Sequence, residues 1–144
     1  MSQSTEILGH KSITLLAQTT IAAAVSAQVG STFKFSDAVK YLLVEAALVY
    51  GAGGTTVKVW IQTRVAGGTW RDIMCLAFTT AAATKWSAVV SSTALAAAIT
   101  ASDGALADDT ILNGFLGSEF RVKYTTTGTY TGTTHLTVRA TAKG

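Results

Sequence analysis

The sequence predicts an all-β protein that folds as a single β-sandwich of the jelly-roll or immunoglobulin-like type, with about seven to nine antiparallel strands and at most one short helix. Three observations lead to this prediction. Apolar and polar residues alternate with a period of two in many short segments. Turn signals made of glycine, asparagine and aspartate recur at intervals of roughly 8 to 12 residues. The chain of 144 residues has the length of one domain.

The N-terminal quarter predicts an arm followed by strands. Residues 1–11 are polar and show no periodicity, and we expect them to form an extended arm that precedes a domain over residues 12–144. Residues 12–18 and 19–29 are rich in threonine, isoleucine, valine and alanine, which favours one or two strands. Gly30 then provides a break.

The segment Ile13–Val25 imitates the apolar region of a secretory signal peptide. Polar residues 18–20 interrupt it, and Glu6 leaves the segment before it only weakly positive. We therefore expect a protein made in the cytoplasm without a signal peptide. No stretch reaches the roughly 18 uninterrupted apolar residues of a membrane-spanning helix, so no membrane partner is expected.

Two further segments precede the centre of the chain. Phe33 and Phe35 alternate with polar neighbours and predict a short strand. Residues 41–50 are the most continuously apolar run, and periodicity alone fits either a buried strand or a helix. Because residues 51–54 read Gly-Ala-Gly-Gly directly before the next alternating segment, we expect a strand that enters a hairpin.

Residues 55–78 give the strongest hairpin signal in the chain, with Gly67-Gly68 suited to a tight primed turn or a short bulged loop. Trp60 falls on the same face as charged and amide side chains, so we expect a loop, a sheet or a subunit to cover it. The first arm divides into two faces: Val57, Val59, Ile61 and Thr63 on one, and Lys58, Trp60, Gln62 and Arg64 on the other.

The C-terminal half predicts three more strands around a long loop. Residues 85–93 alternate as a strand, and residues 94–101 have helix propensity over only about two turns. Residues 102–117 contain repeated turn signals and form a long connection, of a kind that is often functional. Residues 120–124 and 136–140 alternate again, and we expect them to pair as a closing hairpin.

Composition limits the classes of function. Charged residues make up 13% of the chain, against roughly 25% in average domains, and the net charge is only +3. Because the basic residues are dispersed, no nucleic-acid partner is expected. A surface of hydroxyl and methyl groups is common where a protein packs into an assembly, and it is also typical of a stable extracellular domain. The absence of proline removes one protection of edge strands, which is tolerable if neighbouring subunits cover the edges.

Residues able to support catalysis are sparse, and we expect no enzyme and no cofactor. His10 and His135 are the two histidines, and no nucleophile, zinc or phosphate-loop motif is present. Cys75 lies within a strand pattern and is expected to be a buried, inert thiol. Carboxylates that could serve as calcium ligands, or simply form turns, are Asp103, Asp108, Asp109 and Glu119.

Aromatic residues allow a different type of site. They could line a glycan-binding face, but we expect the tryptophans to divide between the core and subunit contacts instead. The residues concerned are Trp60, Trp70, Trp86 and Tyr130.

Two segments resemble small β-sandwich structural proteins of tailed bacteriophages. Residues 59–73 read VWIQTRVAGGTWRDI, in which a strand with a Gln-Thr pair leads through Gly-Gly to Thr-Trp-x-Asp. Residues 113–117 (NGFLG) and 121–130 (RVKYTTTGTY) are similar to the closing segment of the same group. The resemblance implies a virion structural protein, most like a capsid decoration (cement) protein.

Such proteins bind the outside of an assembled phage head, bridge major capsid subunits and stabilise the shell, often as trimers. The resemblance thus implies the major capsid protein as partner, a homo-oligomer and a place on the capsid surface. The alternatives are a neck, tail or head-fibre component, or a glycan-binding module. Candidate partner-binding residues are Ser2, Gln3, Ser4, Thr5, Glu6, Ile7 and Leu8 in the arm, with Trp60, Asp108 and Asp109.

Overall fold

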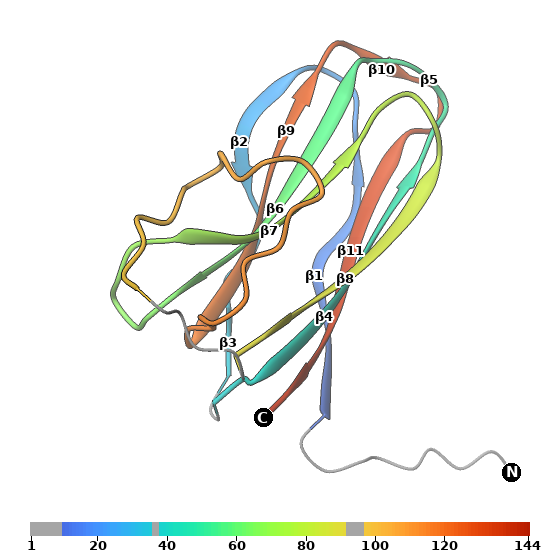
Figure 1. Cartoon of the computed structure of the whole chain (residues 1–144). Coiled ribbons are helices and arrows are strands. Elements are labelled where there is room, and N and C mark those ends of the chain that lie inside the picture. The colour runs from blue at the N-terminus through green and yellow to red at the C-terminus, as the bar shows by residue number, and fades with distance from the viewer. Residues whose placement is uncertain (1–9, 36–37, 92–96) are drawn as a thin grey trace, which may run out of the picture.

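A computed structural model describes residues 10–35, 38–91 and 97–144, and all regular structure in these residues is β (Figure 1). The all-β prediction is therefore confirmed. Three of the eleven strands contain only two residues, which leaves eight longer strands. The strands are β1 (His10–Thr20), β2 (Val25–Val29), β3 (Phe33–Lys34), β4 (Tyr41–Val49), β5 (Ala52–Gly53), β6 (Thr56–Arg64), β7 (Arg71–Phe78), β8 (Ala83–Val90), β9 (Glu119–Thr127), β10 (Tyr130–Thr131) and β11 (His135–Lys143).

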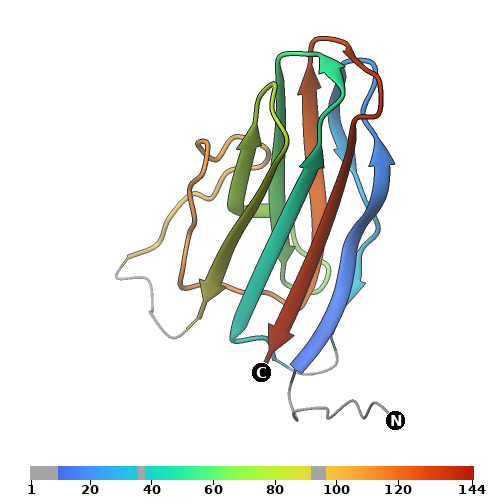
Figure 2. The ribbon, with the colours of Figure 1, turned by 90° about the vertical axis from the view of Figure 1, so that its right-hand side faces the viewer.

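The eight longer strands form two antiparallel sheets that face each other. Sheet A has the order β1-β11-β4-β8 and faces the viewer in Figure 2. Sheet B has the order β2-β9-β6-β7, with β3 added to β9. Among the longer strands the first pairs with the eighth, the second with the seventh, the third with the sixth and the fourth with the fifth. This rolled-up hairpin is the jelly roll, one of the two sandwich types expected from the sequence.

Two of the expected hairpins are wrong. β4 and β6 lie in different sheets, and so do β9 and β11. The connection after β4 and the connection after β9 each cross between sheets, and they pair with each other through β5 and β10. Alternation along a strand reports that one face is buried, but it carries no information on which sheet the strand joins.

The central hairpin is confirmed, because β6 pairs with β7 from Val57–Phe78 to Thr63–Arg71. Residues 65–70 form its loop, which is longer than a tight primed turn. The Gly68 N–H donates to the Val65 carbonyl at 2.8 Å, and Gly67 takes a φ of 73° at the third position of that turn. This position requires a positive φ, which glycine adopts without strain.

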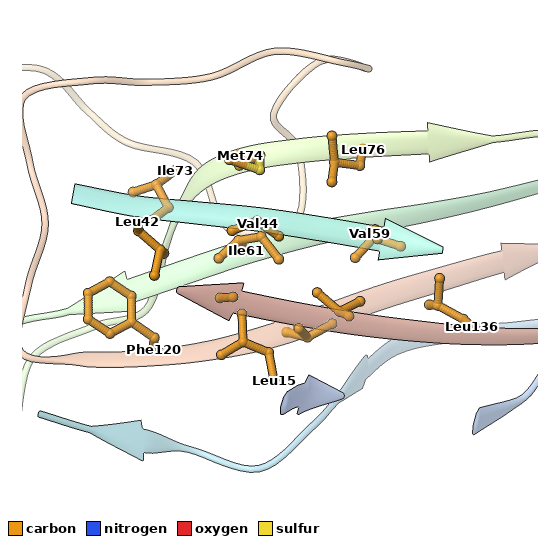
Figure 3. Close-up of a cluster of buried hydrophobic side chains, with 14 of the residues drawn as sticks. Leu15, Leu42, Val44, Val59, Ile61, Ile73, Met74, Leu76, Phe120 and Leu136 are labelled. Atoms are coloured by element: carbon orange, nitrogen blue, oxygen red, sulfur yellow. The ribbon is translucent and has the colours of Figure 1, made fainter. Parts of the chain in front are cut away.

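The core lies between the sheets and consists of the inward-facing apolar residues of both (Figure 3). Val57, Val59 and Ile61 of β6 are fully buried, as the alternation predicts. Leu42 and Val44 of β4 meet them from sheet A. Each such side chain contributes roughly 1.5–3 kcal/mol through burial, so the alternating strands account for the stability of the sandwich.

Bulges interrupt the outer strands at one side of the sandwich. β1 pairs only with β11 among the described residues, and its register shifts twice, between Thr14 and Leu16 and between Leu16 and Thr19. β2 also contains a register shift, and Ala27 within it has a φ of 54°. Because bulges twist an edge away from further pairing, the chain protects these proline-free edges itself.

The boundaries of two expected segments change. His10 and Lys11 belong to β1, so the expected arm is reduced to residues 1–9, which lie outside the described residues. Within the expected helix, residues 94–96 also lie outside them, and residues 97–101 are not helical.

Candidate functional site

The loop between β8 and β9 covers the outer face of sheet B. Residues 97–118 of this loop run in front of β6 and β7 in Figure 1. Trp60 is only 6% exposed, and its indole Nε1–H donates to the Leu106 carbonyl at 3.1 Å. The expectation that Trp60 is covered is confirmed. The cover is this chain's own loop, and contact of Trp60 with a partner stays a prediction.

Asp72 holds the loop on the sheet. This carboxylate is fully buried and lies near the start of β7, at the end of the Thr-Trp-Arg-Asp sequence. Three consecutive backbone amides point at it, an arrangement that suits a negative charge. The donors to Asp72 are Gln62 Nε2 at 2.8 Å, Ser102 Oγ at 2.8 Å, Gly104 N at 2.9 Å, Ala105 N at 3.0 Å and Leu106 N at 3.1 Å.

Gln62 links the two segments on which the phage resemblance rests. Its Nε2 donates to Asp72 at 2.8 Å and to Asp103 at 2.7 Å, and its Oε1 accepts from Arg121 Nε at 2.9 Å. β6 lies between β7 and β9 in sheet B, so residues far apart in sequence form one polar cluster. A hydrogen bond from Lys123, and then the one from Gln62, hold the pKa of Asp103 below its usual range.

The loop also closes the free edge of β7. The Asp72 N–H donates to the Ser102 carbonyl, the Cys75 N–H to the Thr110 carbonyl, and the Leu112 N–H to the Ile73 carbonyl, all within 2.8–2.9 Å. Cys75 is buried beneath this cover, as expected. Burial, followed by the charge of Asp108, raises the pKa of its thiol to about 11. A thiol with that pKa stays protonated at neutral pH and is a poor nucleophile.

The candidate calcium ligands are not assembled into a site. Among the described residues, no group of three or more histidine, cysteine or acidic side chains is placed to hold a metal ion. Asp108 and Asp109 lie half-exposed on the loop and remain candidates for partner contact. Each loop aspartate pairs with a different lysine: Asp103 with Lys123 at 2.8 Å, Asp108 with Lys58 at 3.0 Å and Asp109 with Lys85 at 2.9 Å.

The four candidate aromatic residues do not share a face. Trp60 is covered by the loop, and Tyr130 is 1% exposed in the core. Trp70 is half-buried, with the guanidinium carbons of Arg64 and Arg121 at 4.6 and 4.5 Å from its ring centroids. Trp86 is 59% exposed. The four residues therefore do not line one glycan-binding face, and Trp86 is the most exposed of them.

Trp86 lies in a row of side chains that crosses the outer face of sheet A. The strand register places Trp86 opposite Glu45, Glu45 opposite Arg139 and Arg139 opposite Thr14, one residue from each strand. A groove of about 320 Å³ runs along this row. Its lining residues are Ser12, Ile13, Thr14, Leu43, Glu45, Trp86, Arg139, Ala140 and Thr141.

Sequence reasoning missed Glu45 and Arg139. A signal for Glu45 was present, because it is the one charged residue inside the apolar run 41–49. Glu45 is 24% exposed in its side chain, and its Oε1 lies 3.8 Å from Arg139 Nη1. The two residues become neighbours because β4 pairs with β11, and the alternation of residues along a strand does not indicate which strands pair.

The remaining candidates are not brought together. His10 and His135 lie at opposite ends of the β1–β11 ladder. The arm residues 2–8 lie outside the described residues. In the described part of the chain, no helix is long and apolar enough to span a membrane. Comparisons of the chain with family models, curated proteins and solved structures returned no match.

Proposed function

We propose that this protein is a structural component of a tailed-bacteriophage virion, and specifically a capsid decoration protein that binds the outside of the assembled head. The observation that carries the proposal is the rolled-up pairing order of its eight longer strands. Jelly rolls of this kind recur in viral capsid domains. Since one fold can host unrelated functions, the proposal also rests on the resemblance of residues 59–73, 113–117 and 121–130.

The use of the charged residues supports a structural role. Of the described carboxylates, Asp72 is taken up by loop hydrogen bonds, and each of the others lies in an ion pair within the chain. The segment with the strongest phage resemblance supplies Gln62 and Asp72, which fasten the loop rather than face a ligand. These polar side chains of sheet B therefore hold the β8–β9 loop on the sheet.

A decoration protein stabilises its shell because it binds the assembled lattice and not the free subunits. Such a ligand lowers the free energy of the lattice by about 2.7 kcal/mol per site when its free concentration is one hundred times Kd. The partner is then the major capsid protein, the protein itself is a homo-oligomer, with a trimer favoured, and its location is the capsid surface.

The test is an add-back experiment. Expanded heads are prepared from a phage from which the gene for this protein has been deleted, and the purified protein is added in increasing amounts. We expect saturable binding and a higher temperature of head disruption. Absence of binding to heads, together with binding to necks or tails, would favour the neck or tail alternative and overturn the decoration role.

A further inference from the structure

The groove on the outer face of sheet A combines an exposed aromatic ring with hydrogen-bonding groups of both kinds. Trp86 forms one end, and Thr14, Arg139 and Glu45 continue the row beside it. Because each residue comes from a different strand of one sheet, the backbone fixes their spacing at roughly 4.8 Å per strand. Trp86 and Arg139 are thus about 10 Å apart along the row, a distance that a disaccharide spans.

The polar groups of the groove keep their bonding capacity. The distance of 3.8 Å between Glu45 Oε1 and Arg139 Nη1 is longer than a hydrogen bond. The Glu45 carboxylate therefore retains lone pairs for an incoming hydroxyl, and the Arg139 guanidinium retains N–H donors. Ser12 and Thr141 add hydroxyls at the groove wall, 3.5 Å from each other.

Charge and shape together select the class of ligand. The acid and the base of the groove cancel, so neither an anion nor a cation gains a net attraction. An exposed indole offers a flat apolar face, which suits the apolar C–H face of a sugar ring. The hydroxyls at the edge of the sugar ring can form hydrogen bonds with the carboxylate, guanidinium and hydroxyl groups of the groove. A volume of about 320 Å³ suits a ligand of one or two rings.

A protein partner fits this face less well. Stable protein interfaces bury roughly 800 Å² on each side around an apolar centre. On the strands of sheet A, the exposed large apolar side chains are Trp86 and Val49. Val49 lies at the far end of β4, four residues and about 13 Å from Glu45, so the two do not form one patch.

We propose that the outer face of sheet A carries a binding site for a neutral saccharide, in which Trp86 stacks on a sugar ring and Glu45 and Arg139 bind its hydroxyls. The proposal does not depend on head binding. Jelly rolls also occur as lectin domains, so the fold tolerates such a site.

The test begins with the labelled full-length protein on an array of neutral and charged glycans, followed by calorimetry with the glycans that bind. We expect binding to one group of neutral glycans. Trp86→Ala is expected to weaken the affinity at least tenfold, Glu45→Gln about three- to tenfold, and Trp86→Phe less than Trp86→Ala. Val49→Ala, on the same face but outside the groove, is the matched control and should leave the affinity unchanged.

Three outcomes would overturn the proposal: silence of the wild-type protein across the array, binding by Trp86→Ala equal to that of the wild type, or a preference for charged glycans. Because Trp86 is 59% exposed, Trp86→Ala should retain the wild-type melting temperature, which separates loss of the site from loss of the fold. In the second of these outcomes, loss of self-association or of head binding by Trp86→Ala would assign Trp86 to a protein interface instead.

Discussion

Replacement of Asp72 by asparagine should loosen the β8–β9 loop from sheet B. One carboxylate oxygen accepts from Ser102 Oγ, Ala105 N and Leu106 N, and the other accepts from Gly104 N and Gln62 Nε2. An asparagine amide can accept on only one side. Even in its better orientation, it leaves two donors facing its NH₂ group.

The expected cost follows from these two lost bonds. A buried donor left without an acceptor costs about 1–3 kcal/mol. The three remaining hydrogen bonds also become weaker, because their acceptor no longer carries a charge. We expect Asp72→Asn to lower the free energy of unfolding by about 2–4 kcal/mol. The loss is bounded because a detached loop returns its donors to water.

Urea unfolding gives the change in stability, and hydrogen exchange of the amides of residues 104–106 reports the loop directly. Asp108→Asn is the matched control, because Asp108 is 53% exposed and pairs with Lys58 at the surface. It should cost no more than about 0.5 kcal/mol. An Asp72→Asn variant whose free energy of unfolding lies within about 0.5 kcal/mol of the wild type, with the loop amides still protected, would show that Asp72 does not hold the loop.

Three further predictions concern other parts of the chain. Gly54→Ala should lower the free energy of unfolding by more than about 3 kcal/mol, because the new Cβ would clash with the Tyr130 ring at a φ of +74°. Gly67→Ala, at a φ of +73° with open space around it, should lower it by only about 1 kcal/mol, and equal losses in urea unfolding would contradict this. Cys75 should resist a thiol reagent at neutral pH until the protein is unfolded, since burial raises its pKa to about 11; rapid labelling of the native protein would be inconsistent with a closed loop. The hydrogen bond from Lys123 lowers the pKa of Asp103 in the folded protein, so the stabilisation from this pair is present above the ordinary pKa of 3.8 and is lost as the pH falls through the folded pKa. The free energy of unfolding in urea should therefore fall less with decreasing pH in Asp103→Asn than in the wild type. Identical pH profiles would count against the ion pair.

The sequence was sufficient for the class of fold and for the strands with strong alternation. Residues 57–63 predicted the inner face of β6 correctly because one face of that strand meets the core. The hairpins proposed for β4 with β6 and for β9 with β11 were wrong because both connections cross between the sheets. A period of two identifies a strand, while its neighbour in the sheet depends on contacts between distant residues.

The candidate site was also predictable only in part from the sequence. The position of Trp60 on a polar face predicted a cover, and the loop that provides it could not be identified because its residues bind Asp72 and Gln62 from 30 to 41 positions away. Conversely, Glu45 and Arg139 are separated by most of the chain, and only the pairing of β4 with β11 places them together. Local sequence patterns carry no information about such long-range pairs.

The most direct test of the proposed function is cryo-electron microscopy of expanded heads saturated with the purified protein. We expect density for a two-sheet jelly-roll domain on the outer surface of the head, repeated at symmetry-related positions between the major capsid subunits. Density confined to the neck or tail, or bare heads at saturating protein, would contradict it.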